Sequence, residues 1–306
     1  MVSRDEAGVR LDKLLARDDR VGSRGRALTA LQRGKVFVNG DEVTPLDAAR
    51  RLGAGDCVRV WMDRPGSARK RWSGAGAPGQ LQIVYEDDAL VVVNKPAGLL
   101  TVPLPRRSDA TSVQEMLTAH LRPKGKRTAL TVHRIDRDTS GLVVFGTHGE
   151  AQRRLRDQFR RREVERVYLA VVYGQPEPPA GTWRDYMAWD QTDLVQKATH
   201  PRDPRAREAI SRYSTVRPLQ GAALIEVRLE TGKRNQIRLQ ARMRGHTLVG
   251  EQRYVFGPQA LRPIDFPRQA LHAHQLVFRH PVTGQPLRFE APLPADMVEL
   301  LEELRS

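Results

Sequence analysis

The sequence has a single cysteine, Cys57, among its 306 residues. One thiol cannot form an intrachain disulfide, so we expect a reducing compartment, and its place in an alternating apolar run predicts a small core residue. No apolar run approaches the roughly 20 residues that a membrane-spanning helix requires. The stretch from Met1 to Gly8 is too polar and charged for a signal peptide. These absences lead us to expect a soluble, cytoplasmic protein that does not associate with a membrane.

Metal and cofactor motifs are missing as well. The eight histidines are scattered and, with one distant cysteine, supply no complete set of metal ligands, although His272 and His274 would share a strand face. Residues 74–79 spell G-x-G-x-x-G, but no strand precedes them and a proline interrupts them, which argues against a dinucleotide-binding turn. We therefore expect neither a metal nor an organic cofactor.

Acidic residues are in the minority, and this imbalance is the strongest signal in the composition. The chain has 51 lysines and arginines against 36 acidic residues, a formal charge of +15 and an isoelectric point of about 10.6. Such a charge calls for a polyanionic partner, of which nucleic acid is the first candidate, ahead of an acidic membrane surface or a purely solubilising role. Arginine carries most of the excess, which suits bidentate phosphate contacts and stacking on bases.

The length allows two domains, each with its own core. Residues 1–61 are expected to form the first domain. Their pattern predicts two helices, a strand that enters an Asn-Gly turn, and a closing strand, at 9–15, 23–32, 35–41 and 57–61. Residues 62–80 are rich in glycine, proline and basic residues and should form a flexible linker. Residues 81–306 are expected to form the second domain.

The second domain combines strand and helix patterns. Alternating or short β-branched runs predict strands at 81–85, 89–94, 142–145, 163–174, 209–216 and 223–230. Apolar residues at helical spacing predict helices at 112–121, 149–162 and 292–305. The middle helix carries a dense row of arginines, which favours a surface that faces nucleic acid. Residues 175–209 are rich in proline and charge and are expected to make a long excursion.

The chain is organised around Thr131–Thr147, which reads TVHRIDRDTSGLVVFGT. A carboxylate, Asp136, lies between Arg134 and Arg137, just before a turn and a short apolar run that predicts a buried strand. Nearby positive charge would favour the ionised carboxylate, which can act as a nucleophile, a general base or an electrostatic stabiliser. On this chemistry alone, a surface turn with capping aspartates and solvated arginines is the better interpretation.

The segment His133–Leu142 resembles the catalytic signature of the RluA family of RNA pseudouridine synthases, H-R-L-D-x-x-T-S-G-L, with one Leu-to-Ile exchange. The resemblance implies that Asp136 is the catalytic aspartate and that Arg134 helps to hold the RNA with its target base turned out. Two further segments resemble family signatures. In one, Tyr168 lies between matching basic and alanine residues, which implies that it packs on the uracil or sugar and handles protons at the base.

The other segment, Thr231–Leu239, resembles the common form T-G-R-x-H-Q-I-R, with Lys233 in place of arginine and Asn235 in place of histidine. The resemblance implies that Arg238 forms a salt bridge with Asp136. Lys233 and Arg234 are expected to contact RNA, although the lysine loses the bidentate geometry of arginine. A later segment resembles G-H-P-L-x-G-D-x-x-Y, with Glu251 at the acidic position and Tyr254 at the end.

The first domain resembles the S4-type RNA-binding domain through R-L-D-K-L-L, S-R-G-R-A and G-K-V-F-V-N-G. That resemblance implies phosphate contacts from its helices, which would give affinity without sequence readout. The basic residues concerned are Arg10, Lys13, Arg24, Arg26 and Arg33. The alternative is a charged helical surface with no partner.

Together the resemblances imply an α+β protein: a small S4-like domain, then a catalytic domain with a mixed, mostly antiparallel sheet crossed by a cleft. The expected activity is isomerisation of specific uridines, in large-subunit ribosomal RNA or, as an open alternative, transfer RNA, by a monomer. Two other functions stay open. One is a non-catalytic ribosome-assembly factor that only binds RNA. The other is a glycosidase-like hydrolase that uses Asp136 and Asp138 as a carboxylate pair.

Overall fold

The structure is a computed structural model that describes residues 1–3, 5–32, 34–43, 47–62, 81–103, 111–124, 127–191, 195–254 and 264–305. Most of the expected linker, residues 63–80, lies outside these ranges, and so does the G-x-G-x-x-G segment at 74–79. Arg33 also lies outside the described residues.

The N-terminal unit packs two helices against a small antiparallel sheet. Its elements are α1 (Leu11–Leu15), α2 (Arg24–Gln32), β1 (Val36–Val38), β2 (Asp41–Glu42) and β3 (Val58–Val60), with strand order β2-β1-β3. Asn39 and Gly40, between β1 and β2, have φ values of 53° and 84°, the left-handed conformation that a two-residue hairpin turn requires. The apolar faces of both helices and of β1 form a separate core.

Cys57 is exposed, so the prediction of a core cysteine is wrong. The reason is the two-residue period of a strand, which turns successive side chains to opposite faces. Val58 and Val60 pack against the small core, and Cys57 and Arg59 therefore point to solvent.

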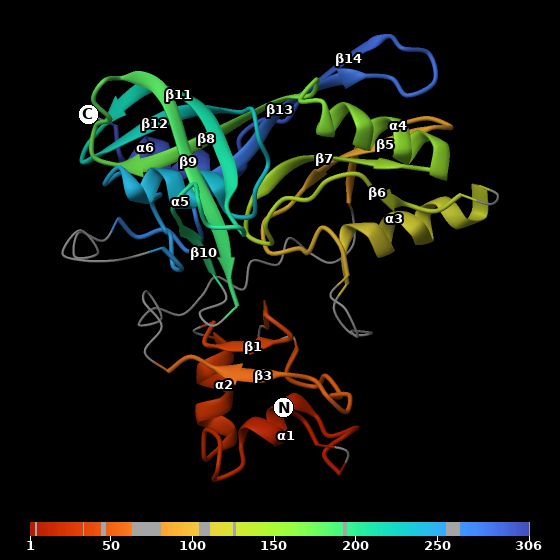
Figure 1. Cartoon of the computed structure of the whole chain (residues 1–306), viewed down its shortest axis with the longest axis vertical. Helices are drawn as coiled ribbons and strands as arrows, with labels where there is room; N and C mark the ends of the chain where they lie inside the picture. The colour runs from red at the N-terminus through yellow and green to blue at the C-terminus, as the bar shows by residue number, and fades with distance from the viewer. Residues whose placement is uncertain are drawn as a thin grey trace.

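The C-terminal domain is built on one large sheet with the strand order β10-β9-β11-β12-β8-β13-β7-β5-β4, to which β14 and β6 add at β13 and β7 (Figure 1). All of its neighbours pair antiparallel except β7 and β13, which run parallel. The expectation of a mixed, mostly antiparallel sheet is confirmed. The strands are β4 (Gln82–Glu86), β5 (Leu90–Lys95), β6 (Leu130–Thr131), β7 (Ser140–Gly146), β8 (Glu165–Tyr173), β9 (Ala180–Asp190), β10 (Val195–Ala198), β11 (Arg207–Leu219), β12 (Ala222–Leu229), β13 (Leu271–Arg279) and β14 (Pro286–Glu290).

Helices cover both faces of this sheet. They are α3 (Val113–Leu121), α4 (Gly149–Arg160), α5 (Gln236–Met243) and α6 (Ala295–Glu303), with a short 3-10 turn, η2 (Arg122–Lys124). Alternate residues of the strands pack against α3 and α5 on one face and against α4 and α6 on the other. Among the described residues no helix is long and apolar enough to cross a membrane.

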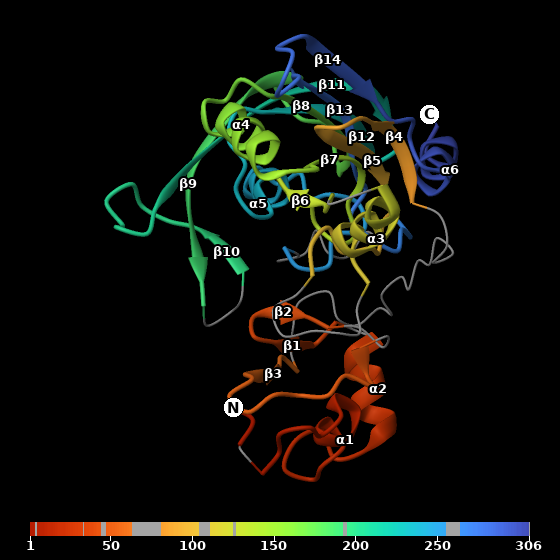
Figure 2. The same cartoon turned by 90° about the vertical axis from the view of Figure 1, so that its right-hand side faces the viewer.

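The long excursion expected at 175–209 contains a pair of strands. Strand β9 pairs with β11 from Ala180 to Met187 and carries β10 at its far end, where the two strands reach toward the N-terminal unit (Figure 2). Trp183 and Met187 lie on one face of β9 and are buried. Their burial stabilises part of the expected excursion as a regular strand. Helix α5, which begins within the signature segment Thr231–Leu239, was not predicted as a helix.

Candidate active site

Asp136 lies on the loop between β6 and β7, and this loop is tied to the segment that follows β5. The hydroxyl of Thr101 donates to the carbonyl of Ile135 at 2.8 Å, and the buried ammonium group of Lys95 donates to the carbonyl of Arg137 at 2.7 Å. Ile135 itself is buried in the main core. The backbone on both sides of Asp136 is therefore held in place, as a reacting group requires.

Gly141 allows β7 to lie beside β13 directly after this loop. Its φ is 112°, and a Cβ atom there would lie 2.2 Å from the carbonyl oxygen of Ala273 on β13. Only glycine fits this combination of backbone angle and close approach. The Thr139-Ser140-Gly141 turn therefore fixes the point at which the loop that carries Asp136 joins β7.

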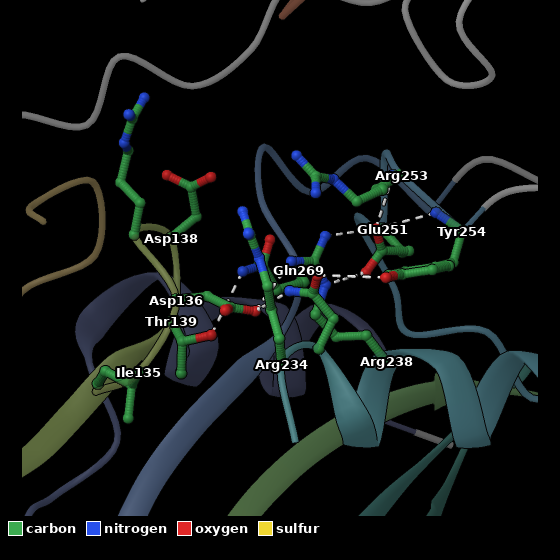
Figure 3. A network of polar contacts seen from close by, with 12 residues as sticks. Ile135, Asp136, Asp138, Thr139, Arg234, Arg238, Glu251, Arg253, Tyr254 and Gln269 are labelled. Carbon is green, nitrogen blue, oxygen red and sulfur yellow. Dashed lines mark hydrogen bonds and ion pairs between the residues drawn. The ribbon is translucent and has the colours of Figure 1, made fainter. Parts of the chain in front are cut away.

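The charged side chains of Asp136, Arg238 and Glu251 form a row of two ion pairs at the site (Figure 3). The Nη1 group of Arg238 donates to Oδ2 of Asp136 at 2.9 Å, which confirms the predicted ion pair. The Nε and Nη2 groups of Arg238 donate to the two carboxylate oxygens of Glu251 at 2.6 and 2.7 Å. Glu251 is fully buried and the side chain of Arg238 is 9% exposed, whereas the side chain of Asp136 is 24% exposed. Asp136 is thus the member of this row that a substrate can reach.

Asn235 and Tyr254 extend this network. The side-chain amide of Asn235 donates to Oδ2 of Asp136 at 2.6 Å, and the hydroxyl of Tyr254 donates to the amide oxygen of Asn235 at 3.2 Å. In the sequence, Asn235 departs from a signature, and Glu251 and Tyr254 belong to a later segment. No role was predicted for any of the three. Because they meet only when α5 and the following loop fold back to the β6–β7 loop, spacing alone could not join them.

The charges around Asp136 keep it ionised. Burial by itself would raise the pKa of Asp136, but the charge and hydrogen bond of Arg238, the amide of Asn235 and the charge of Arg253 outweigh it, so its pKa is lowered. The pKa of Glu251 is lowered as well, because Arg238 and two backbone amides outweigh its burial. The two arginines that flank Asp136 in the sequence are placed differently. Arg137 donates to the carbonyl of Glu42, and Arg134 is exposed.

Asp136 opens onto a cavity of about 750 Å³ in the C-terminal domain, which is large enough for a nucleotide. Tyr168 on β8 lines the cavity with its buried ring. Burial raises the pKa of the Tyr168 phenol, Asp136 adds to this effect and Arg166 opposes it, so the phenol is protonated at neutral pH. The cavity brings together six of the site residues predicted from the sequence: Asp136, Tyr168, Arg238, Arg134, Lys233 and Arg234.

Among the described residues, the predicted RNA-binding residues of the N-terminal helices do not line this cavity. Arg10 forms an ion pair with Asp12, whereas Lys13, Arg24 and Arg26 are exposed on α1 and α2. Both overall views place α1 on the side of the N-terminal unit that is farther from the large sheet (Figures 1 and 2). Lys13, which α1 carries, therefore lies away from the cavity.

The acidic strand β2 of the N-terminal unit meets the site. Asp41 lies 3.6 Å from a guanidinium nitrogen of Arg234, and Glu42 lies 3.6 Å from one of Arg253. Asp41 and Glu42 also line a second, small cavity of about 80 Å³. Asp136 and Arg238 line this cavity as well. The guanidinium of Arg234 lies 4.1 Å above the ring of Trp189 on β9, which places the β9–β10 pair at the same rim.

His272 and His274 do not form a metal site. The ring nitrogens of His272 pair with the Ser140 hydroxyl at 2.9 Å and the carbonyl of Ala291 at 3.2 Å, and a ring nitrogen of His274 lies 2.8 Å from that same carbonyl. Throughout the part of the chain that the structure describes, no group of three or more His, Cys, Asp or Glu side chains could hold a metal ion.

Comparisons with known proteins agree on one family. A family model described as RNA pseudouridylate synthase matches residues 89–242. An uncharacterized RNA pseudouridine synthase, YlyB of Bacillus subtilis, is 36% identical over 99% of this chain and 96% of its own length. Ribosomal large subunit pseudouridine synthase D of Vibrio cholerae is 33% identical over 99% of this chain and 94% of its own length. Among solved structures, human RNA pseudouridylate synthase domain containing 4 shares the fold, with a TM-score of 0.59 and 21% identity over 73% of this chain and 92% of that one.

Proposed function

The chain belongs to the RNA pseudouridylate synthase family, and from this premise we propose that it isomerises uridines of large-subunit ribosomal RNA with Asp136 as the catalytic carboxylate. Family membership carries the reaction, which is pseudouridine synthesis. The ribosomal substrate is supported by relatives named ribosomal large subunit pseudouridine synthase D, such as that of Zymomonas mobilis at 35% identity. The role of Asp136 is supported above all by its ion pair with Arg238 at the wall of a nucleotide-sized cavity.

The reaction breaks the bond from uracil N1 to ribose C1′, turns the base and joins C5 to C1′. The proton on C5 is lost and N1 gains one, so the product is an isomer of the substrate. Both hydrogen bonds described for the Asp136 carboxylate fall on Oδ2, which leaves Oδ1 to face the ribose. The ionised oxygen can attack C1′ as a nucleophile or remove a sugar proton as a base, and both routes need the same position of the carboxylate.

Tyr168 and Arg134 receive the base in this proposal. A uridine must leave its stack to reach Asp136, and an everted base needs a flat apolar wall on which to pack. Tyr168, Ile237 and Leu271 supply such a wall within the cavity. The protonated phenol of Tyr168 can exchange a proton at the base, and the exposed guanidinium of Arg134 holds the displaced strand.

The basic surfaces supply the remaining affinity. Helix α4 and the two residues after it carry exposed arginines, of which Arg160 and Arg162 line the cavity. The others are Arg153, Arg154, Arg156 and Arg161. The N-terminal unit, which we interpret as an S4-like domain, offers Lys13, Arg24 and Arg26 to a more distant part of the same RNA. We propose that the protein acts as a monomer in the cytoplasm, with large-subunit ribosomal RNA preferred over transfer RNA.

Mapping of pseudouridines in ribosomal RNA from cells with and without this protein tests the proposal. We expect one or a few large-subunit positions to lose the modification and to regain it with the wild-type chain but not with Asp136→Asn. With purified protein, Asp136→Asn should lower the rate by about 10²- to 10⁴-fold, the range typical of a lost catalytic proton-transfer group, and should still bind the RNA. Asp138→Asn is the matched control and should remain active.

The same measurement separates the alternatives. An assembly factor would bind ribosomal RNA without forming pseudouridine, and a hydrolase would release free uracil. The hydrolase needs two facing carboxylates, but the Asp138 carboxylate points away from that of Asp136 (Figure 3). An unchanged pseudouridine map would contradict the proposal, and so would full activity of Asp136→Asn.

A further inference from the structure

Asn235 occupies an unusual place at the start of α5. It is the N-cap residue of that helix, it is buried, and its backbone is left-handed, with φ 53° and ψ 24°. Asparagine tolerates this conformation better than most residues. An asparagine at an N-cap normally accepts a hydrogen bond from its own helix, but the Asn235 side chain makes no such capping bond. Its amide is directed instead to Oδ2 of Asp136, 99 positions earlier in the chain.

Tyr254 determines which way the Asn235 amide points. The backbone N–H of Gln196 on β10 donates to the Tyr254 hydroxyl at 3.1 Å, so the hydroxyl proton is free to go to the amide oxygen of Asn235, 3.2 Å away. The oxygen of the amide must then face Tyr254 and its NH₂ group must face Asp136. The ring of Tyr254 is 2% exposed, and the guanidinium of Arg238 lies 5.5 Å from its centroid, so the anchor is itself packed in place.

The Asn235 amide gives the carboxylate something that Arg238 does not. Both groups donate to the same oxygen, Oδ2, from two different directions. Two donors on one oxygen restrict rotation of the carboxylate, which one donor alone would allow. The amide is also neutral and does not titrate, so this second hydrogen bond persists across the pH range in which a histidine would change charge.

We propose that Asn235, oriented by Tyr254, is a positioning residue that holds the Asp136 carboxylate with Oδ1 toward the substrate. This inference rests on the proposed function of Asp136. It extends that function by assigning a reaction role to a residue that differs from the common signature. The contact between Gln196 and Tyr254 also connects the β9–β10 pair to the catalytic carboxylate.

Two substitutions test the role of Asn235, and they differ in their risk to folding. Asn235→Gly removes the amide and keeps a residue suited to φ 53°, and Asn235→Asp keeps the shape but replaces the donor with a second negative charge. For Asn235→Gly we expect kcat for ribosomal RNA to fall about 10- to 100-fold, the effect of one lost hydrogen bond to a charged group, with KM unchanged. Asn235→Asp should fall further.

The pH profile distinguishes positioning from a merely structural role. Loss of a donor to Asp136 should move the acid side of the kcat/KM profile to higher pH in both variants, because the carboxylate then takes up a proton more readily. Asn235→His should recover part of the activity but with a new dependence on pH near 6.5, where imidazole titrates. Tyr254→Phe, which keeps the ring but not the hydroxyl, should shift the profile in the same direction by less.

The controls distinguish a failure of the positioning role from a failure of the proposed function. Asn94→Asp is the matched substitution outside the site, since the Asn94 amide donates to the exposed Gln82 and not to Asp136, and its profile should equal that of the wild type. If the wild type makes no pseudouridine, the proposed function fails. If the wild type is active and Asp136→Asn is not, yet the Asn235 variants and Tyr254→Phe keep the wild-type kcat and profile, the positioning role is overturned. A loss confined to KM or RNA binding would overturn it as well.

Discussion

The Nη1 group of Arg238 lies 2.9 Å from Oδ2 of Asp136, although the two residues are 102 positions apart in the chain. The contact exists because α5 follows β12 and points its first turn at the loop before β7. Glu251 binds the other edge of the guanidinium with both oxygens, so the arginine cannot turn away from Asp136. The fully buried carboxylate of Glu251 thus orients the arginine that holds Asp136.

Removal of the charge on Glu251 should weaken both the fold and the reaction. Glu251→Gln leaves Arg238 with Asp136 as its remaining charged partner, and we expect the free energy of unfolding to fall by about 2–3 kcal/mol, because a buried charge-assisted pair is lost. Urea denaturation measures this change, and kcat should fall in parallel. Glu290→Gln, which breaks the exposed pair with Arg288, is the control and should cost less than about 1 kcal/mol. Equal losses in the two variants would contradict the special role of the buried pair.

Neutralisation of the acidic strand β2 should strengthen RNA binding. Asp41 and Glu42 lie beside Arg234 and Arg253 at the rim of the site, where we expect them to compete with RNA phosphates for these cations. In the double variant Asp41→Asn and Glu42→Gln we expect the Kd for ribosomal RNA to fall roughly 3- to 10-fold at low salt, since the more exposed pair, Asp41 with Arg234, is worth up to about 1 kcal/mol and both substitutions remove negative charge near the RNA. Glu302→Gln with Glu303→Gln on α6 is the matched control. An unchanged or weaker affinity in the β2 variant would show that these acids do not oppose RNA.

Removal of two arginines from α2 should reduce affinity without slowing the chemical step. Arg24 and Arg26 are exposed and do not line the cavity, so Arg24→Ala with Arg26→Ala should raise the Kd and leave kcat at saturating RNA unchanged. The slope of log affinity against log salt should become shallower by about 0.7–0.9 for each phosphate that the protein no longer neutralises. Arg288→Ala on β14 provides the control for removal of a surface charge. A salt slope equal to that of the wild type would exclude α2 from the RNA-binding surface.

The stability of the protein should fall as the pH drops from 7 to 5, in part through His272. Burial lowers the pKa of His272 to about 4, whereas an unfolded histidine has a pKa of about 6.5. Between these two values the unfolded chain binds the extra proton, so stability is lost as the pH falls, by about 2 kcal/mol between pH 7 and pH 5. Urea denaturation at both pH values measures the loss. His272→Asn should be less stable at pH 7 but should lose about 2 kcal/mol less on acidification. An equal loss in the variant and the wild type would contradict the assignment to His272.

Local pattern was enough to predict most elements of the fold. The two-residue alternation of β12 and the short apolar runs of β5 and β7 predicted strands, and the Asn39-Gly40 pair predicted the hairpin between β1 and β2. The resemblance of three short segments to family signatures also predicted that Asp136, Tyr168 and Arg238 would line one cavity, which they do. These predictions succeed because strand periodicity, turn geometry and a contiguous signature are all properties of neighbouring residues.

Tertiary structure alone decided the rest. The sequence by itself determined that an ionised carboxylate would follow a basic segment and precede a buried strand. It did not determine that Asn235, Glu251 and Tyr254 would orient that carboxylate, or that the acidic strand β2 would lie at the rim of the site. Nor did it show that β9 and β10 would form within a proline-rich segment. The physical reason is that each of these contacts joins side chains from distant segments, and only the pairing of the strands and the return of α5 bring them within hydrogen-bonding distance.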